Sequence, residues 1–307
     1  MIIPGLGATL AGAGLAALPG LREWRRIPVD ARLRAQAPGR FAELPGGLTH
    51  YDWLGPERGP VAVCVHGLTT PSFVWLALAR RLVAMGYRLL IYDLYGRGYS
   101  GRPRGPQGPR FFTDQLRALL AHEGLDADIT LIGYSMGGAI ATAFAAEEAH
   151  RLRRLVLLAP AGMTHDPGRL TAWAVEWPLA GDWLFHMGFP AATRRAVARE
   201  AGAETDGIGT RQLAELNRRG FVRSVLAALR GTLRHPMEAQ HRAVAQTGLP
   251  VAAIWGREDR VIPLRAMGML TQWNRHARHR VIDGAGHGLP YTHAAEIAAA
   301  LRDLQAG

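Results

Sequence analysis

Residues 133–137 read Gly-Tyr-Ser-Met-Gly, with Ser135 at the centre of a Gly-x-Ser-x-Gly pattern. The segment 128–132 before it is apolar and β-branched, which predicts a buried strand, and the alanine-rich segment 139–146 after it predicts a helix. A serine on a tight strand-to-helix turn is typical of a nucleophile elbow, where the strained backbone requires neighbours without bulk. The surrounding glycines, including Gly138, meet that requirement. The stretch therefore predicts an activated serine at the start of a helix.

A candidate acid and a candidate base follow this serine along the chain. The apolar run 251–255 predicts a strand that leads to Asp259, and the run 280–282 predicts another strand that leads to His287 within Gly-Ala-Gly-His-Gly. Serine, then acid, then histidine is one of the chain orders in which catalytic triads occur. The order therefore favours Ser135, Asp259 and His287 as catalytic residues.

Four motifs lie where predicted strands end. They are His66-Gly67, the Asp-x-x-Gly-x-Gly-x-Ser run 93–100, the serine motif 133–137, and the pairing of 255–259 with Gly286-His287. With these motifs the chain resembles the α/β-hydrolase superfamily over about residues 40–307, in its serine-nucleophile, esterase- and lipase-like branch with a cap. The resemblance implies an α/β fold with a mostly parallel central sheet, helices on both faces and a helical cap insertion.

The resemblance also implies a role for each site residue. His287 would take the proton of Ser135 during attack on an electrophilic carbon and later return it to the leaving group. Asp259 would hold the imidazole in the correct tautomer and stabilise its charged form. The backbone N–H groups of Leu68 and Met136 would form the oxyanion hole.

Two of these assignments leave alternatives open. Thr69 is the alternative to Leu68, which is placed only by its position after the His-Gly pair. Asp166 is the alternative to Asp259, because some relatives carry the acid after the preceding strand. Glu258 adjoins Asp259, but adjacent side chains face different ways, and the motif favours Asp259.

The chain divides into a core, a cap and an N-terminal segment. We expect the α/β-hydrolase core at residues 37–160 and 241–307, and a helical cap at 161–240, because an uninterrupted strand–helix connection would be far shorter. A hydrophobic content of 48% is sufficient for a sizeable core. The cap is rich in aromatic residues, which favours a lid over an apolar substrate pocket. The predicted pocket residues are Trp173, Trp177, Trp183 and Phe185.

The formal net charge is +11, and all 36 basic residues are arginine. The arginines are scattered and do not alternate with aromatic residues, so the sequence predicts no nucleic-acid site. The single cysteine, Cys64, excludes an intrachain disulfide. No metal-binding spacing and no glycine-rich phosphate loop occur, so we expect neither a metal nor a cofactor.

Residues 1–21 carry no charged side chain, and Arg22, Arg25 and Arg26 follow them. About 20 apolar residues is the length that spans a bilayer, although the glycines and two prolines here favour a span only weakly. The segment is read as a membrane anchor that leaves the catalytic domain on the cytoplasmic side, because arginines stay there. The alternatives are an apolar helix docked on the rest of this protein, in the cytoplasm, or a disordered leader.

We expect hydrolysis of carboxylic esters of a lipophilic acid through an acyl-enzyme on Ser135, as in a carboxylesterase or a monoacylglycerol-lipase-like enzyme. The apolar cap favours a small hydrophobic substrate. The first alternative is a carbon–carbon bond hydrolase of ring-cleavage products, although such enzymes usually carry Asn where Tyr134 stands. A second alternative, of another class, is a ligand-binding protein of this fold without catalysis.

Overall fold

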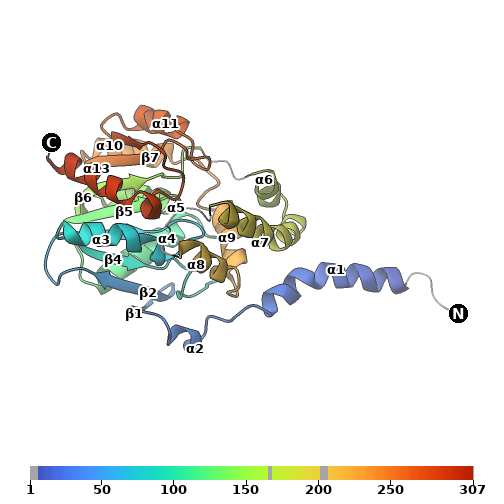
Figure 1. Cartoon of the computed structure of the whole chain (residues 1–307). Helices are drawn as coiled ribbons and strands as arrows, with labels where there is room; N and C mark the ends of the chain where they lie inside the picture. The colour runs from blue at the N-terminus through green and yellow to red at the C-terminus, as the bar shows by residue number, and fades with distance from the viewer. Residues whose placement is uncertain (1–5, 165–167, 201–206, 307) are drawn as a thin grey trace.

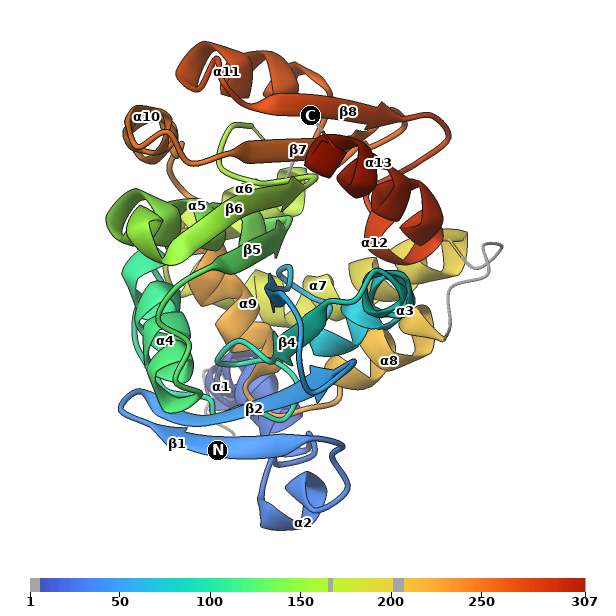
Figure 2. The ribbon, with the colours of Figure 1, turned by 90° about the vertical axis from the view of Figure 1, so that its left-hand side faces the viewer.

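The computed structural model describes residues 6–164, 168–200 and 207–306. Its centre is an eight-stranded sheet in the order β1-β2-β4-β3-β5-β6-β7-β8 (Figures 1 and 2). The first two pairings, β1 with β2 and β2 with β4, are antiparallel, and all others are parallel. The strands are β1 (Arg40–Leu44), β2 (Gly47–Leu54), β3 (Val61–Val65), β4 (Arg88–Tyr92), β5 (Ile129–Tyr134), β6 (Leu152–Leu158), β7 (Val251–Gly256) and β8 (Arg278–Ile282).

Helices cover both faces of the sheet (Figure 2). On one face α3 packs against α12 and α13, and on the other α5 packs against α4 and α10, which contacts α11. The helices of these layers are α3 (Leu76–Ala84), α4 (Pro109–His122), α5 (Met136–Glu148), α10 (Glu238–Gln246), α11 (Arg265–Trp273), α12 (Leu289–Thr292) and α13 (Ala294–Ala306), with 3-10 turns Ser72–Trp75 and Ala149–Arg151.

The central strands are apolar on both sides because helices cover both faces. In β3, Val63 and Val65 pack into the core cluster under α4 and α5, whereas Ala62 and Cys64 pack into the cluster under α3 and α13. Every residue of β5 and β7 is buried, and the edge strand β8 alternates between exposed and half-buried residues until its end. The predicted fold class, a mostly parallel sheet between helical layers, is confirmed.

The segment between β6 and α10 forms helices beyond the carboxyl ends of the strands (Figure 1). Arg230 holds three of them together: its guanidinium donates to the carbonyl oxygens of Ala174 and Val175 and to Asp182. The helices are α6 (Arg169–Glu176), α7 (Ala180–Glu200), α8 (Ile208–Glu215) and α9 (Phe221–Arg230). We call these four helices the cap helices.

The N-terminal segment forms α1 (Leu6–Trp24), followed by the short α2 (Ala31–Arg34). Figure 1 shows α1 extending away from the core at the end where the cap helices lie. Across the described residues, no helix combines the length and the apolar character that crossing a bilayer requires. The bilayer-spanning form of the expected anchor is therefore unsupported, since Pro19 and several glycines dilute the apolar residues of α1.

Because a histidine is buried on α10, we expect the free energy of unfolding to depend on pH. The His241 ring stacks on Trp273 with centroids 5.9 Å apart, and neither ring nitrogen has a hydrogen-bond partner among the described residues. Burial lowers the pKa of His241 from 6.5 to about 4. Between these two pKa values the unfolded chain binds a proton that the folded chain does not, so stability falls as pH falls through this window.

We therefore expect His241→Leu to make the protein less sensitive to acid. Its free energy of unfolding, relative to that of the unmodified protein, should rise by up to about 1.4 kcal/mol per pH unit as pH falls through the window. Urea unfolding above and within the window measures this difference. Identical pH slopes for the two proteins would contradict it.

Candidate active site

Ser135 lies on the turn between β5 and α5 with φ 52° and ψ −120°. This is a strained conformation for a residue with a side chain, and the packing around the turn maintains it. The amide of Ser135 donates to the carbonyl of Leu158, and its own carbonyl accepts from the amides of Gly138 and Ala161. These backbone contacts to β6 and the segment after it hold the serine at the carboxyl edge of the sheet.

Gly137, the last residue of the Gly-x-Ser-x-Gly motif, allows α5 to approach the end of β3 closely. A Cβ on Gly137 would lie 2.0 Å from the carbonyl oxygen of Val65 and 2.5 Å from that of His66. Both are backbone atoms at the end of β3, so they cannot move aside as a flexible side chain would. Helix α5 therefore lies directly against the strand that leads to Leu68.

We expect Gly137→Ala to lower the free energy of unfolding by about 3 kcal/mol, because the new methyl group overpacks this contact. It should also lower kcat, since it would push α5 away from the segment that carries Leu68. Gly268→Ala in α11 is the matched control: apart from its chain neighbours and the backbone of its own helix, no described heavy atom lies within 4 Å of its added Cβ, and helix propensity favours alanine. Denaturant unfolding of both variants measures the difference, and equal stabilities would contradict the expectation.

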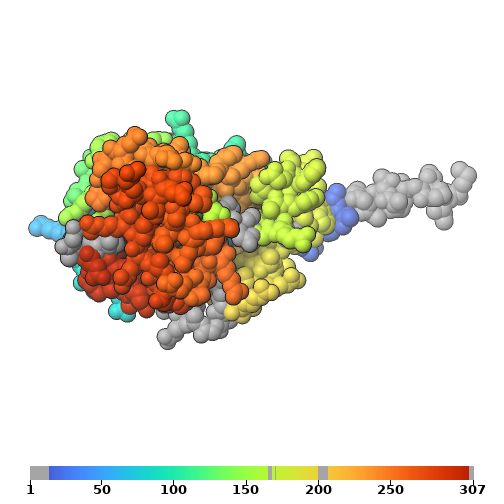
Figure 3. Space-filling view, turned by 90° about the horizontal axis from the view of Figure 1, so that it is seen from above, coloured from blue at the N-terminus to red at the C-terminus, as the bar shows by residue number. Residues whose placement is uncertain are grey.

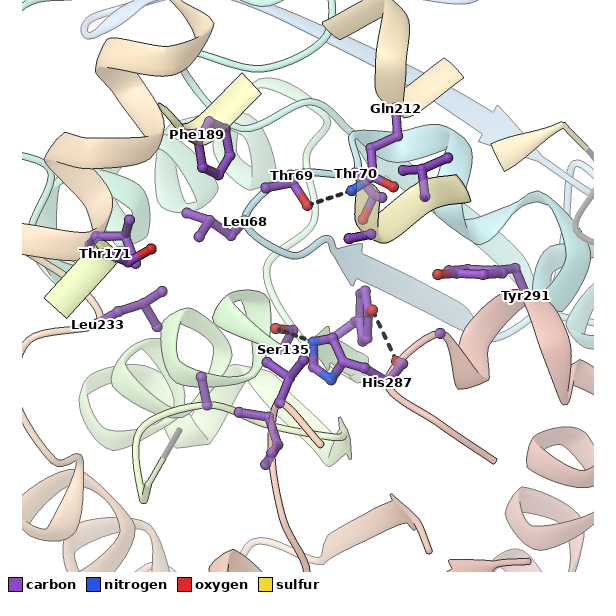
Figure 4. A pocket seen from close by; sticks show the side chains of 18 residues that line it. Leu68, Thr69, Thr70, Ser135, Thr171, Phe189, Gln212, Leu233, His287 and Tyr291 are labelled. Carbon is purple, nitrogen blue, oxygen red and sulfur yellow. Dashed lines mark hydrogen bonds between the residues drawn. The ribbon is translucent and has the colours of Figure 1, made fainter. Parts of the chain in front are cut away.

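Three side chains from different strand ends form a hydrogen-bonded chain at this edge. Ser135 Oγ lies 3.0 Å from Nε2 of His287, and Nδ1 of His287 lies 2.8 Å from Oδ2 of Asp259. Figure 4 shows the serine and the imidazole facing each other at the base of a pocket. The second carboxylate oxygen of Asp259 accepts the amides of Val261 and Ile262, each at 2.8 Å, which fixes the carboxylate. The arrangement can move a proton from the serine to the imidazole.

Of the two predicted oxyanion residues, Met136 follows the serine in the chain and Leu68 lines the same cavity. Met136 is the first residue of α5, where an amide has no acceptor within its own helix. Leu68 follows the His-Gly pair after β3 and lines the same cavity as Ser135. The structure places Thr69, the alternative to Leu68, in the same cavity wall, where its hydroxyl accepts from Gln212 at 3.0 Å.

His66 orients the peptide that carries the Leu68 amide. The Leu94 amide donates to Nε2 of His66 at 2.9 Å, so the ring proton resides on Nδ1, which donates to the carbonyl of Gly67 at 2.8 Å. Burial lowers the pKa of His66 to about 4, so the ring is neutral near neutral pH. Because Gly67 and Leu68 share one peptide group, this hydrogen bond fixes the direction of the Leu68 N–H.

Arg97 is a further residue at the site that we did not select from the sequence. Its fully buried guanidinium donates to the carbonyl oxygens of Leu68 and Ser224 and to the side chain of Gln107. Burial lowers the pKa of Arg97 to about 9. It joins the predicted oxyanion segment to cap helix α9, and its place inside the Asp-x-x-Gly-x-Gly-x-Ser motif was the available signal.

The aspartate that begins the same motif, Asp93, stabilises the local backbone. Asp93 is buried and accepts hydrogen bonds from His50, from the Ser72 amide and from the Tyr99 amide. Burial opposes ionisation of Asp93, but the contacts with His50 outweigh it and hold the pKa of Asp93 well below its usual range. The carboxylate therefore stabilises its turn, and the described contacts do not join it to Ser135.

The alternative acid, Asp166, lies outside the described residues. Among the described residues, the His287 ring nitrogens are hydrogen-bonded to Asp259 and Ser135, and not to Glu258. In the parts of the chain that the structure describes, no group of three or more His, Cys, Asp or Glu side chains is arranged to hold a metal ion. Cys64 is buried in β3, where burial raises the pKa of its thiol.

A cavity of about 270 Å³ opens above Ser135 and His287 (Figure 4). Its walls come from the segment after β3, from the loops that carry the triad, and from all four cap helices. The lining residues are Leu68, Thr69, Thr70, Tyr134, Ser135, Ala161, Thr171, Phe189, Ala196, Val197, Gln212, Leu229, Leu233, Val261, Ile262, His287, Gly288 and Tyr291.

The four aromatic residues that we expected in the pocket lie elsewhere. Trp173 and Trp177 stack on each other on the outer surface, Trp183 donates its indole N–H to the carbonyl of Leu15, and Phe185 is buried against Phe189. Cap helices present one face to the cavity and another to solvent, and the sequence does not show which face is which. Phe189, on the same helix as Phe185, lines the cavity instead.

Comparison with known proteins agrees with this architecture. Residues 60–294 match the model of a family described as alpha/beta hydrolase fold. The chain is 32% identical over 254 residues to 2-hydroxymuconate semialdehyde hydrolase from Pseudomonas sp. strain CF600, which covers 79% of this chain and 85% of that protein.

A second relative and a solved structure extend the comparison. Identity is 28% to a 2-hydroxy-6-oxononadienedioate/2-hydroxy-6-oxononatrienedioate hydrolase of Paraburkholderia xenovorans, covering 80% of this chain and 86% of that protein. The crystal structure of the enol-lactonase from Burkholderia xenovorans LB400 superposes with a TM-score of 0.74 at 20% identity, covering 87% of this chain and all of that one. The chain belongs to the α/β-hydrolase family.

Proposed function

We propose that this protein is a serine hydrolase that cleaves uncharged carboxylic esters of a lipophilic acid through an acyl-enzyme on Ser135. The hydrogen-bonded order Ser135, His287, Asp259 supports the nucleophile, base and orienting roles. The amides of Leu68 and Met136 are the proposed oxyanion donors.

In the first step, Ser135 Oγ attacks the ester carbonyl carbon while its proton passes to Nε2 of His287. The carbonyl oxygen becomes an anion that the two amides stabilise. The imidazolium then protonates the alcohol oxygen, the C–O bond breaks, and the acyl group remains on Ser135. Water attacks this acyl-enzyme, gives its proton to His287, and releases the acid as Ser135 recovers a proton.

The lining of the cavity is the observation that carries the substrate class. Among the described residues that line it, none is arginine, aspartate or glutamate, and most are aliphatic, aromatic or threonine. A substrate carboxylate buried there would lack a positive partner near the cap, which is costly. An uncharged acyl chain, by contrast, gains from contact with residues such as Phe189, Leu229 and Leu233.

A carbon–carbon bond hydrolase is the second candidate, because the chain is 32% identical to 2-hydroxymuconate semialdehyde hydrolase. The other relative is named for a dienedioate substrate, which carries two carboxylates. Substrates of that kind fit the uncharged cavity poorly, so we rank this candidate below ester hydrolysis.

Hydrolysis of p-nitrophenyl esters from acetate to palmitate tests the proposal, with Ser135→Ala as the control. We expect serine-dependent turnover that peaks at a medium acyl length, since the cavity is of modest volume. A fluorophosphonate should label the intact protein and not the variant. Turnover of a 2-hydroxy-6-oxo-dienoate without turnover of any ester would favour the second candidate, and absence of labelling would favour a binding protein without catalysis.

A further inference from the structure

Large apolar side chains are exposed at one end of the molecule. Trp24 is 70% exposed, Trp177 58% and Leu179 83%. In the described part of the chain, all exposed large hydrophobic residues except Val261 lie in two segments. One segment is α1 with the residues just after it, and the other is α6 with the turn that leads to α7. We call the following set the apolar end face: Leu15, Leu21, Trp24, Ile27, Trp173, Trp177 and Leu179.

Helix α1 is held against the cap helices, so its exposed residues and theirs belong to one surface. The Trp183 indole on α7 donates to the Leu15 carbonyl at 2.9 Å. The Glu23 carboxylate accepts the amide of Gly220, and the Ile27 amide donates to the Asn217 carbonyl at 2.8 Å. Helices α1 and α7 are in contact. Figure 1 shows α1 extending outward from the end where the cap helices lie, and Figure 3 shows the blue part of α1 next to the cap helices.

The exposed charges on the segments that carry this face are mostly positive. Exposed arginines outnumber exposed acidic residues within the described residues 14–34 and 168–199. The exposed acidic residues in these ranges are Asp30 and Glu176. The exposed arginines are Arg22, Arg25, Arg32, Arg169, Arg194, Arg195 and Arg199. Tryptophan beside arginine suits the headgroup region of a membrane, where the indole occupies the boundary and the guanidinium meets phosphate.

We propose that the apolar end face docks on an anionic phospholipid surface, with α1 lying along the membrane. The tryptophans and leucines would enter the headgroup boundary, and exposed arginines of the same segments would contact lipid phosphates. The contacts of Leu15, Glu23 and Ile27 hold the C-terminal half of α1 beside the cap helices, so both can meet the same lipid surface.

Docking would place the cavity next to the membrane. Helices α6 and α7 carry Trp173 and Trp177 on or near their outer surface, and Thr171 and Phe189 in the cavity wall. The same two helices would therefore contact lipid on one side and substrate on the other. This inference goes beyond ester hydrolysis and does not rest on it, because a membrane contact is measured without substrate.

Flotation with lipid vesicles tests the proposal on the full chain. We expect binding to phosphatidylcholine vesicles that contain about 30% phosphatidylglycerol, and much weaker binding to phosphatidylcholine alone. The double variant Trp24→Ser/Trp177→Ser should lose binding to both. Arg22→Gln/Arg25→Gln should weaken partition to the anionic vesicles by about 25-fold at low ionic strength, since each arginine contributes about fivefold.

A matched pair of arginines at the other end of the sheet serves as the control. Arg153, near the start of β6, and Arg275, just before β8, are exposed at the amino ends of the strands. Arg153→Gln/Arg275→Gln makes the same change in net charge and should leave binding intact. Equal losses in both arginine pairs would show attraction by net charge alone and overturn the proposal.

Two further outcomes would also overturn the proposal. One is no binding to anionic vesicles at low ionic strength. The other is a dimer in sedimentation without lipid that Trp24→Ser/Trp177→Ser converts to monomer, because a second copy would then cover the face. All substituted residues are exposed, and thermal unfolding checks that each variant folds. Hydrolysis of a short soluble ester, measured separately, distinguishes failure of docking from failure of the proposed reaction.

Discussion

Ser135→Ala is expected to lower kcat by about a million-fold, because no other described group at the cavity is placed to attack the same carbon. His287→Ala should cost about as much, since the serine hydroxyl is a poor nucleophile without a base. The double variant should be no slower than either single variant, because the two residues act as one unit. Single-turnover and steady-state assays on the preferred ester measure all three.

Protein stability is the control for this prediction. Removal of the serine hydroxyl takes away one hydrogen bond at a strained position, so the free energy of unfolding should change by no more than about 1 kcal/mol. Substrate binding should persist in Ser135→Ala, because the cavity walls are unchanged. Strictly additive losses in the double variant, or appreciable turnover by Ser135→Ala, would contradict the proposed nucleophile.

Asp259→Asn is expected to lower kcat by about ten-thousand-fold while preserving the fold. The asparagine oxygen can still accept the amides of Val261 and Ile262, which the aspartate accepts through Oδ1. Its amide nitrogen, however, cannot accept the proton on Nδ1 of His287 and favours the opposite tautomer. Nε2 would then carry a hydrogen and could not take the proton of Ser135.

Asp166→Asn is the matched variant, because Asp166 is the alternative acid. Its turnover should stay close to that of the unmodified protein. An active Asp259→Asn with an inactive Asp166→Asn would show that the acid is misassigned. Unfolding curves of both variants separate loss of activity from loss of structure.

The motif around Ser135 could be identified from the sequence because it depends on residues that are close together in the chain. A strand, a turn without side-chain bulk and a helix follow one another within about twenty residues. The strong alternation of apolar strands and amphipathic helices likewise predicts the parallel sheet, because each such strand must be buried on both faces. The strands predicted at 128–132 and 251–255 begin and end within two residues of the observed β5 and β7.

The pocket residues could not be identified in this way. Trp173 and Phe189 both lie on cap helices, α6 and α7, yet the first faces solvent and the second faces the cavity. The outcome depends on how the cap helices rotate against one another and against the core. Arg97 is similar, since its partners Leu68 and Ser224 are distant in the chain.

By itself, the sequence determined the α/β architecture and the candidate serine, acid and histidine, because each depends on short-range patterns at strand ends. Tertiary structure alone decided which side chains line the cavity, how Arg97 joins the segment of Leu68 to the cap, and where α1 packs. Those features depend on contacts between segments far apart in the chain. Short-range hydrophobic patterns record that a residue is buried or apolar, but not which distant partner it meets.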